Sequence, residues 1–167
     1  MFKTIAEFTA EWGQVTEGTK RLFDTLTDDS LSQAVGPNRR TLGRLAAHIV
    51  TAPHEMMSRT GLSFETPLAY DYIPESGAEI AQAYRAMEQG LLNALRNQWD
   101  DAKLAEVSEM YGDEWPNGFT LRAVIHHEIH HRGQMTVLMR QAGLQIPGMY
   151  GPVMEDWEEW GMKAPIV

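Results

Sequence analysis

The sequence predicts an all-α fold, a four-helix bundle with long connections and a short C-terminal helix. Apolar residues recur at intervals of three and four along four long stretches of the chain, and runs of β-branched residues are few. The length of 167 residues fits one domain with a substantial core, and no repeat or linker divides the chain. Residues 1–167 are therefore predicted to form a single domain.

The first predicted helix spans residues 4–27 and ends at Asp28-Asp29-Ser30. Its apolar positions follow helical spacing: Ile5, Phe8, Trp12, Val15, Leu22, Phe23 and Leu26. The second predicted helix begins at Thr41, a residue type whose side chain caps helix N-termini, and includes Met56. Pro53 lies within this helix and is expected to remove one backbone hydrogen bond and bend it.

The third predicted helix follows a long loop. Residues 60–77 contain several glycines and prolines, which are typical of loops and turns. The helix is expected to run from Ser76 to Trp99, with Ile80, Tyr84, Met87, Leu91, Leu92 and Leu95 buried. Residues 100–119 show no clear period and are predicted to be irregular.

The fourth predicted helix holds the most informative residues of the chain. Thr120 is expected to cap its N-terminus, and the helix is expected to run to Ala142. Gly143 follows, and glycine suits the left-handed conformation that often ends a helix. After a turn rich in glycine and proline, Val153 to Trp160 are predicted to form the short terminal helix.

Composition excludes several classes of function. The formal net charge is −9, which disfavours nucleic acid and anionic membrane surfaces as partners. The chain has no cysteine, so disulfides, thiolate metal ligands and a cysteine nucleophile are excluded. We find neither a signal peptide nor a segment apolar enough to span a membrane, and we expect a cytoplasmic location.

Four of the six histidines lie between positions 126 and 131. They form two pairs, His126 with His130 and His127 with His131, each spaced i, i+4 and so on one face of a helix. A helical wheel places His127 and His131 on the apolar side and His126 and His130 outside it. Two buried imidazoles need polar partners, and a shared metal ion satisfies both.

His48 supplies a third imidazole. It lies at the border of the apolar face of the second predicted helix, where it faces the fourth helix across the bundle, whereas His54 lies on the polar side. The sequence therefore predicts a metal site of His48, His127 and His131. Zinc suits such ligands best, and nickel, cobalt and iron are compatible with them. The competing interpretation is that these are hydrogen-bonded core histidines.

The same run also matches a protease pattern. His127-Glu128-Ile129-His130-His131 reads as H-E-x-x-H, in which the two outer histidines bind zinc and the glutamate is the general base. The pattern fixes only three of its five positions, so a histidine-rich run often matches it by chance. We also find no predicted sheet along which a peptide substrate would lie. If the match is a coincidence, Glu128 is expected either to hydrogen-bond to a metal ligand or to contact another helix of the bundle.

Three segments together resemble the DinB/YfiT-like superfamily of metal-dependent four-helix-bundle proteins. They are Thr41-Leu42-Gly43-Arg44-Leu45-Ala46-Ala47-His48, His127-x-x-x-His131-Arg132-Gly133-Gln134 and Gly148-Met149-Tyr150-Gly151-Pro152. The resemblance covers nearly the whole chain. It implies a four-helix bundle with a divalent metal bound by His48, His127 and His131.

The resemblance also implies an activity and a partner. The superfamily includes transferases that use low-molecular-weight thiols such as bacillithiol, and mycothiol-dependent isomerases; many members have no known activity. Because this chain has no cysteine, the thiol would have to be a cosubstrate. Members are often homodimers, and some residues off the predicted core stripe of the fourth helix could form such an interface or contact the terminal segment. These are Ile125, Ile129, Thr136 and Val137.

Three hypotheses for the function remain open. The first is a metal-dependent enzyme resembling thiol S-transferases, which activates a low-molecular-weight thiol or water. The second is a non-catalytic metal-binding module of a stress response, and the third is an H-E-x-x-H hydrolase. Gln134, which could orient a water or substrate, and Glu128 are the candidate catalytic residues.

Two further sets of side chains have two interpretations each. The arginines near the start of the second helix could bind an anionic thiol or be solvated charges, and three aromatic residues could line a pocket or pack in the core and tail. The sets are Arg39, Arg40 and Arg44, and Trp115, Tyr150 and Trp157.

Overall fold

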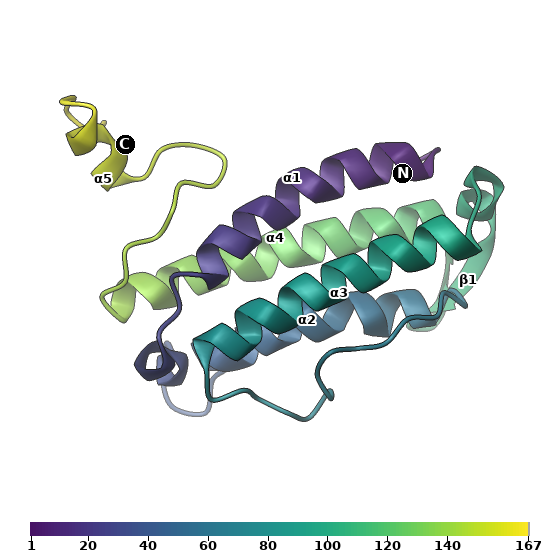
Figure 1. The fold of residues 1–167 in the computed structure, drawn as a ribbon, viewed down its shortest axis with the longest axis horizontal. Coiled ribbons are helices and arrows are strands. Elements are labelled where there is room, and N and C mark those ends of the chain that lie inside the picture. Colours follow the sequence, from purple (N-terminus) through teal and green to yellow (C-terminus); the bar gives the residue numbers. More distant parts are fainter. Residues whose placement is uncertain (167) are drawn as a thin grey trace.

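The structure is a computed structural model that describes residues 1–166. Four long helices run along one another, and a short fifth helix follows them (Figure 1). The helices are α1 (Ile5–Phe23), α2 (Leu42–Ser58), α3 (Gly77–Gln98), α4 (Asn117–Gln141) and α5 (Met154–Glu159). The connections contain two 3₁₀ helices, η1 (Asp28–Ser32) and η2 (Asp101–Ala105). The predicted all-α class, the four-helix bundle and the short C-terminal helix are confirmed.

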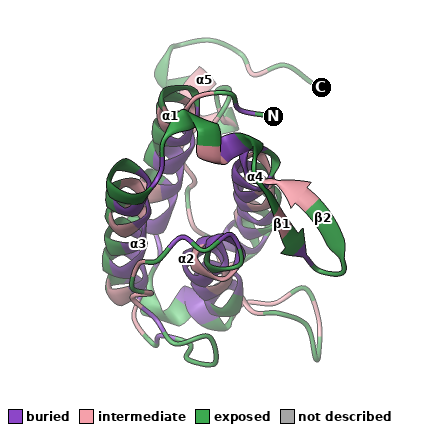
Figure 2. Ribbon diagram, turned by 90° about the vertical axis from the view of Figure 1, so that its right-hand side faces the viewer, coloured by how far each residue is buried: buried purple, intermediate pink, exposed green. Residues whose placement is uncertain are grey.

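The four long helices form a ring in the order α1, α3, α2, α4. Figure 2 looks along the bundle and shows buried residues on the inner side of each helix. The neighbouring pairs are α1 with α3, α3 with α2, α2 with α4, and α4 with α1. The chain therefore crosses the bundle between α1 and α2 and again between α3 and α4. This topology makes α2 and α4, which hold the candidate ligands, direct neighbours.

Helix α1 begins where its capping residues predict and ends early. Thr4 Oγ1 accepts a hydrogen bond from Glu7 N at 3.1 Å, and Glu7 Oε2 accepts one from Thr4 N at 3.2 Å. The last helical residue is Phe23, before the predicted end at residue 27. Just beyond it, the Thr25 hydroxyl donates to Leu22 O at 2.8 Å, a local bond that competes with continuation of the helix.

Helix α2 is continuous through its proline. Thr41 is the N-cap as predicted, and its Oγ1 accepts from Arg44 N at 3.3 Å. Pro53 lies inside the helix, which continues to Ser58. The proline removes one backbone donor, and the Thr51 hydroxyl bonds to the carbonyl four residues before it at 3.1 Å, a contact often found in bent helices.

The segment 100–119 is not irregular, contrary to the prediction. It contains a β-hairpin of β1 (Val107–Met110) and β2 (Asp113–Pro116), which pair antiparallel. The two residues between the strands, Tyr111 and Gly112, have φ of 58° and 89°, as a type I′ turn requires. The strands are only four residues long, and their sequences, Val-Ser-Glu-Met and Asp-Glu-Trp-Pro, lack the alternation of apolar and polar residues that would predict them.

Helix α4 begins at Asn117 rather than at a cap on Thr120, which is buried inside its first turns. Asn117 fixes this start with its own polar groups. Its backbone N donates to Glu106 O at 2.8 Å, and its Nδ2 donates to Lys103 O at 3.1 Å. These bonds join the helix to η2, so they depend on a contact outside the helix that a local pattern does not reveal.

The end of α4 follows the prediction. Gly143 has a φ of 78°, and its N donates to Arg140 O at 3.0 Å. Leu144 N donates to Met139 O at 2.9 Å. These two bonds form a Schellman motif, in which glycine adopts the left-handed conformation at the least steric cost.

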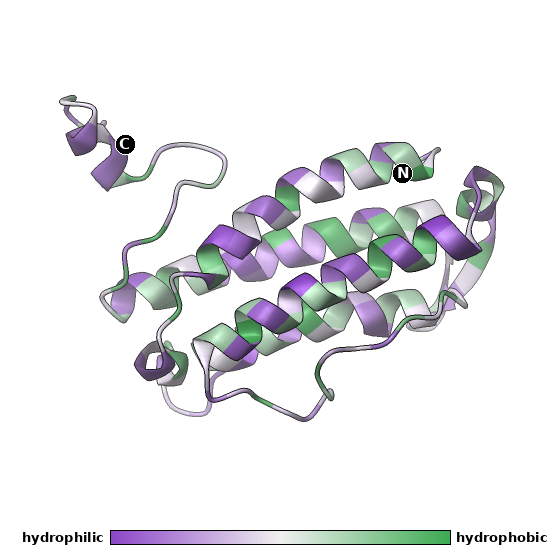
Figure 3. Ribbon diagram, viewed as in Figure 1, coloured by the Kyte–Doolittle hydropathy of each residue, from purple (hydrophilic) through white to green (hydrophobic). Residues whose placement is uncertain are grey.

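The core lies inside the ring of helices, and hydrophobic residues alternate with hydrophilic ones along each helix (Figure 3). Over residues 1–166, none of the helices combines the length and hydropathy needed to cross a bilayer. Ile125, predicted to lie off the core stripe of α4, is fully buried, whereas Ile129 is half-buried and Val137 is exposed. The wheel placed Ile125 wrongly because α4 is covered by α1 as well as α2.

After α4 the chain turns back, and α5 stands apart from the four long helices, to the side of the bundle and near the C-terminal end of α4 (Figure 1). Arg21 Nη2 donates to Gly148 O at 3.1 Å, which ties the turn after α4 to α1. Arg140 and Glu155 form an ion pair between α4 and α5. Tyr150, predicted to line a pocket or pack in the tail, is 73% exposed, while Trp157 packs edge-on against Trp160.

Candidate metal centre

Three imidazoles from two neighbouring helices meet at the seam between α2 and α4. His127 Nε2 lies 3.1 Å from His48 Nε2 and 3.1 Å from His131 Nε2. The three ligand atoms all lie within 4.8 Å of one another. The structure thus brings together the three histidines that the sequence singled out; we call them the histidine cluster. His48 and His127 are half-buried, and His131 is 9% exposed.

Gln134 fixes the tautomer of His131. Its Oε1, which can only accept, lies 2.7 Å from His131 Nδ1, so that nitrogen carries the proton. The lone pair of His131 is therefore on Nε2, which faces the other two imidazoles. Gln134 Nε2 in turn lies 3.2 Å from His130 Nε2 and donates to it. His130 is exposed and outside the cluster, as predicted, but it orients the glutamine that orients a candidate ligand.

Burial keeps the cluster unprotonated. It lowers the pKa of His48 and of His127 from 6.5 to about 4, and the other cationic groups nearby act in the same direction. The pKa of His131 is also lowered by burial, although its hydrogen bond to Gln134 opposes this. Neutral imidazoles have free lone pairs at physiological pH. Three such nitrogens at these separations suit a divalent cation with His₃ ligation.

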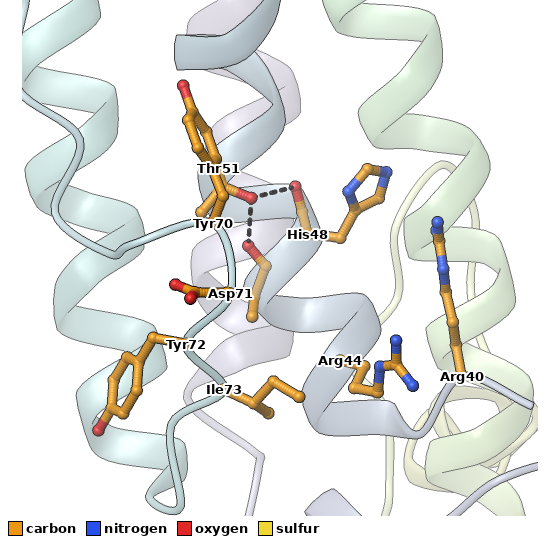
Figure 4. A pocket seen from close by; sticks show the side chains of 9 residues that line it. Arg40, Arg44, His48, Thr51, Tyr70, Asp71, Tyr72 and Ile73 are labelled. Carbon is orange, nitrogen blue, oxygen red and sulfur yellow. Dashed lines mark hydrogen bonds between the residues drawn. The ribbon is translucent and has the colours of Figure 1, made fainter.

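Arginines line two cavities on one side of the histidine cluster. A cavity of about 200 Å³ beside His48 is lined by Arg40 and Arg44. In Figure 4, Arg40 lies on the side toward which the His48 ring points. A second cavity, of about 340 Å³, is lined by Arg39, Arg40, His131 and Gln134. Arg40 lowers the pKa of all three histidines, although less than their burial does. The positive charge here suits an anionic ligand beside the cluster.

A third cavity, of about 550 Å³, opens beside His48 and His127 on the other side. The hairpin covers it with Tyr111 and Trp115, and α2 contributes Glu55. Sequence reasoning named Trp115 as a possible pocket residue but missed Glu55 and Tyr111. Local patterns carry no signal for them, because Tyr111 reaches Glu55 only through the hairpin turn.

Glu128 does not belong to this centre. It is buried, and its Oε1 accepts from Thr19 Oγ1 at 2.5 Å on α1 and from Tyr84 Oη at 2.6 Å on α3. The neighbouring Arg132 also contacts α1, where its Nη1 donates to Val15 O at 2.7 Å. Of the two expected roles of Glu128, the structure thus shows the contact with other helices. The literal H-E-x-x-H run does not place its glutamate among the histidines.

The two remaining histidines stay apart from the cluster. His126 is exposed on α4. His54 Nδ1 hydrogen-bonds to the hydroxyl of Tyr70, and its ring packs edge-on against Phe64 at 5.0 Å between centroids. Of the six histidines, therefore, three form the cluster, one supports it through Gln134, and two lie elsewhere on the surface.

Comparison with known proteins adds a family to this geometry. The sequence model of the DinB family matches residues 1–162. The uncharacterised protein YrdA of Bacillus subtilis (strain 168) is 44% identical over 166 residues, which cover 99% of this chain and 99% of YrdA.

Two crystal structures of DinB-like proteins have the same fold. The one from Bacillus cereus ATCC 10987 is 45% identical, with a TM-score of 0.86 over 90% of this chain and 100% of that one. YjoA of Bacillus subtilis is 17% identical, with a TM-score of 0.68 over 86% of this chain and 97% of that one. At that identity, the similarity to YjoA concerns the fold alone.

Proposed function

The chain belongs to the DinB family, and we propose that it is a metal-dependent enzyme whose histidine cluster binds one divalent cation. The observation that supports this most directly is the convergence of three imidazole nitrogens, one from each histidine, within 4.8 Å. Zinc is the metal we favour, because imidazoles are among its usual ligands, and nickel, cobalt and iron suit the same site. Three protein ligands leave a coordination position open, the pattern of catalytic rather than structural zinc sites.

We propose that the reaction is transfer to a low-molecular-weight thiol. A bound cation would lower the pKa of a thiol or water beside it and so supply a nucleophile at neutral pH. The thiol would lose its proton to solvent, its sulfur would bond to an electrophilic carbon, and the leaving group would depart with the electron pair of the broken bond. If the enzyme is instead a hydrolase, a water molecule takes the place of the thiol as the nucleophile in the same reaction.

The residues of the chain have distinct parts in this proposal. His48, His127 and His131 hold the cation, and Gln134 keeps His131 in the ligating tautomer. Arg40 places positive charge beside the cluster, where it favours the thiolate and any carboxylate of the thiol. Because Glu128 bonds to α1 and α3, we do not assign it the role of a general base.

Turnover of a thiol tests the proposal. Metal-loaded protein should accelerate the reaction of a small thiol with 1-chloro-2,4-dinitrobenzene, and chelation should remove the activity. His48→Ala should abolish turnover, whereas His126→Ala, a change at an exposed histidine outside the cluster, should not. Metal binding without turnover of any thiol or ester would support the second hypothesis, a non-catalytic metal-binding module.

We further propose that the protein is a cytoplasmic homodimer. Exposed apolar side chains on α4 and in the C-terminal segment support a second copy as partner, among them Val137 at 54%, Tyr150 at 73% and Trp160 at 57% exposure. Light scattering should give about twice the chain mass of 18.9 kDa. A monomer at micromolar concentration would contradict this part of the proposal.

A further inference from the structure

The cavity beside His48 and His127 differs in chemistry from the arginine side of the cluster. We call it the hairpin chamber and define it by the rest of its lining, Thr51, Ala52, Glu55, Met56, Tyr70, Tyr111, Trp115 and Ala123. Its volume of about 550 Å³ is in the usual range for small-molecule sites. None of the described residues that line it is a lysine or arginine, whereas Arg39, Arg40 and Arg44 line the two cavities on the other side.

The aromatic wall of the hairpin chamber is held in place. Tyr111 Oη donates to Glu55 Oε2 at 2.5 Å, and the Arg59 guanidinium lies 4.5 Å from the centroid of the Tyr111 ring. The Trp115 ring packs edge-on against Tyr111 at 6.0 Å and against Phe119 at 5.0 Å between centroids. The hairpin is thus fastened to α2, and its aromatic rings form a fixed surface next to the histidines.

The polar groups of the chamber suit an uncharged ligand. Burial and the hydrogen bond to Glu55 raise the pKa of Tyr111 to about 12, so its phenol stays neutral. Glu55 adds negative charge, although Arg59 pairs with it at 2.7 Å. In the metal-free protein an anionic group would meet a carboxylate here and no lysine or arginine among the described lining residues, whereas an aromatic ring would stack on Trp115.

We propose that the hairpin chamber binds an uncharged aromatic group of the electrophilic substrate, and that Trp115 and Ala123 determine which group fits. The inference rests on the proposed function, because it assigns the two sides of the histidine cluster to two reactants. The apolar electrophile occupies the chamber beside His48 and His127, and the thiol approaches from the side of Arg40. A nucleophile held between them then reaches a carbon at the mouth of the chamber.

Binding of two matched probes tests the inference without turnover. 4-Nitrobenzyl alcohol and 4-nitrobenzoate have the same ring, and a nitroaromatic quenches the fluorescence of a tryptophan that it contacts. The full chain, freed of metal by chelation so that the benzoate carboxylate has no cation to bind, should bind the neutral alcohol with saturable quenching and the anionic benzoate at least about tenfold more weakly. Trp115→Phe should remove most of the quenching by the alcohol. Equal binding of the two probes would overturn the selectivity for an uncharged group.

A second variant fills the chamber without altering the hairpin. Ala123 lies on α4, is half-buried and lines the cavity, so Ala123→Leu places a larger side chain in it. Leucine favours the helical conformation, so the change should leave α4 intact. The alcohol should then bind about tenfold more weakly, with metal content unchanged. Ala86→Leu, at an exposed position on α3, is the matched control and should leave binding unchanged. Undiminished binding to Ala123→Leu, or an equal loss in Ala86→Leu, would contradict the inference.

The probe experiment separates this inference from the proposed function. If the protein binds no metal but the alcohol still binds in a manner sensitive to Ala123→Leu, the chamber is a ligand site and the metal proposal fails. If the protein binds zinc at the histidine cluster and no saturable quenching by the alcohol occurs, the chamber proposal fails and the metal proposal stands.

Discussion

At the scale of single residues, the histidine cluster depends on one amide for its orientation. Gln134 Oε1 accepts a hydrogen bond from the protonated Nδ1 of His131, and only that tautomer presents a lone pair on Nε2 to the cluster. The amide is itself fixed by His130. A ligand's outer hydrogen bond sets both its ring orientation and its basicity, so this chain of bonds is part of the site.

Removal of the amide should weaken the metal site without destroying it. We expect Gln134→Leu to lower zinc affinity by about 10- to 100-fold, because His131 loses the bond that selects its tautomer. Gln134→Glu keeps an acceptor at the same position and should retain the affinity. Competition with a chromogenic chelator measures both variants. Equal affinities for Gln134→Leu and the parent protein would show that the amide has no positioning role.

The lowered pKa values of His48 and His127 predict how the metal-free protein responds to acid. In the unfolded chain these groups take up protons below pH 6.5, and in the fold only near about 4. Between these values the unfolded state binds more protons than the folded state, so the free energy of unfolding rises with pH. The contribution of the two histidines to it is fully present above pH 6.5 and is lost as the pH falls toward about 4.

Thermal unfolding at a series of pH values measures this effect. A double variant, His48→Leu with His127→Leu, is the control that retains the carboxylates of the chain. Its melting temperature should fall less between pH 6.5 and about 4 than that of the parent protein. Parallel pH curves for the two proteins would contradict the assigned cause.

At the scale of helices, Glu128 joins three of them. Its carboxylate on α4 accepts from Thr19 on α1 and from Tyr84 on α3, and the side chain is only 2% exposed. Burial raises its pKa to about 7, against the effect of these two hydrogen bonds. The residue next to His127 in sequence therefore points into the bundle, while His127 points to the seam with α2.

Replacement of Glu128 should change stability and leave the metal site unchanged. Glu128→Ala leaves the buried Tyr84 hydroxyl without its acceptor, leaves the Thr19 hydroxyl only its longer bond to Val15 O, and creates a cavity, so it should cost roughly 3 kcal/mol of unfolding free energy. Glu128→Gln keeps an acceptor and should cost less. Chemical denaturation measures the stability of each variant, and its zinc content shows whether the metal site is retained. Loss of turnover in a folded, zinc-loaded Glu128→Gln protein would instead support the hypothesis that the protein is an H-E-x-x-H hydrolase with Glu128 as its general base.

The helices could be predicted where their signals are local. Thr41, Gly143 and the spacing of apolar residues determine helix ends and faces through contacts within a few positions. The start of α4 could not be predicted, because Asn117 is held by η2. The hairpin was missed because its strands are short and lack alternation of apolar and polar residues. The role of its aromatic side chains depends on contacts with α2, such as that of Tyr111 with Glu55.

At the scale of the whole molecule, the ring order of the helices creates the site. Because α2 and α4 are neighbours, His48 meets two histidines that follow it by roughly eighty positions in the chain. The i, i+4 spacing predicted the pair on α4, and a helical wheel predicted that His48 faces it. The cavities could not be predicted, because the loops and the hairpin that line them have no helical period.

Most of the proposed chemistry of this protein depends on binding of a divalent metal by the histidine cluster. Zinc titration of the metal-free protein, followed by elemental analysis after gel filtration, tests it most directly. We predict about one zinc per chain for the parent protein and for His126→Ala, and almost none for His48→Ala and His127→Ala. Zinc retained in full by folded His48→Ala and His127→Ala proteins, or no zinc bound by the parent, would contradict the claim.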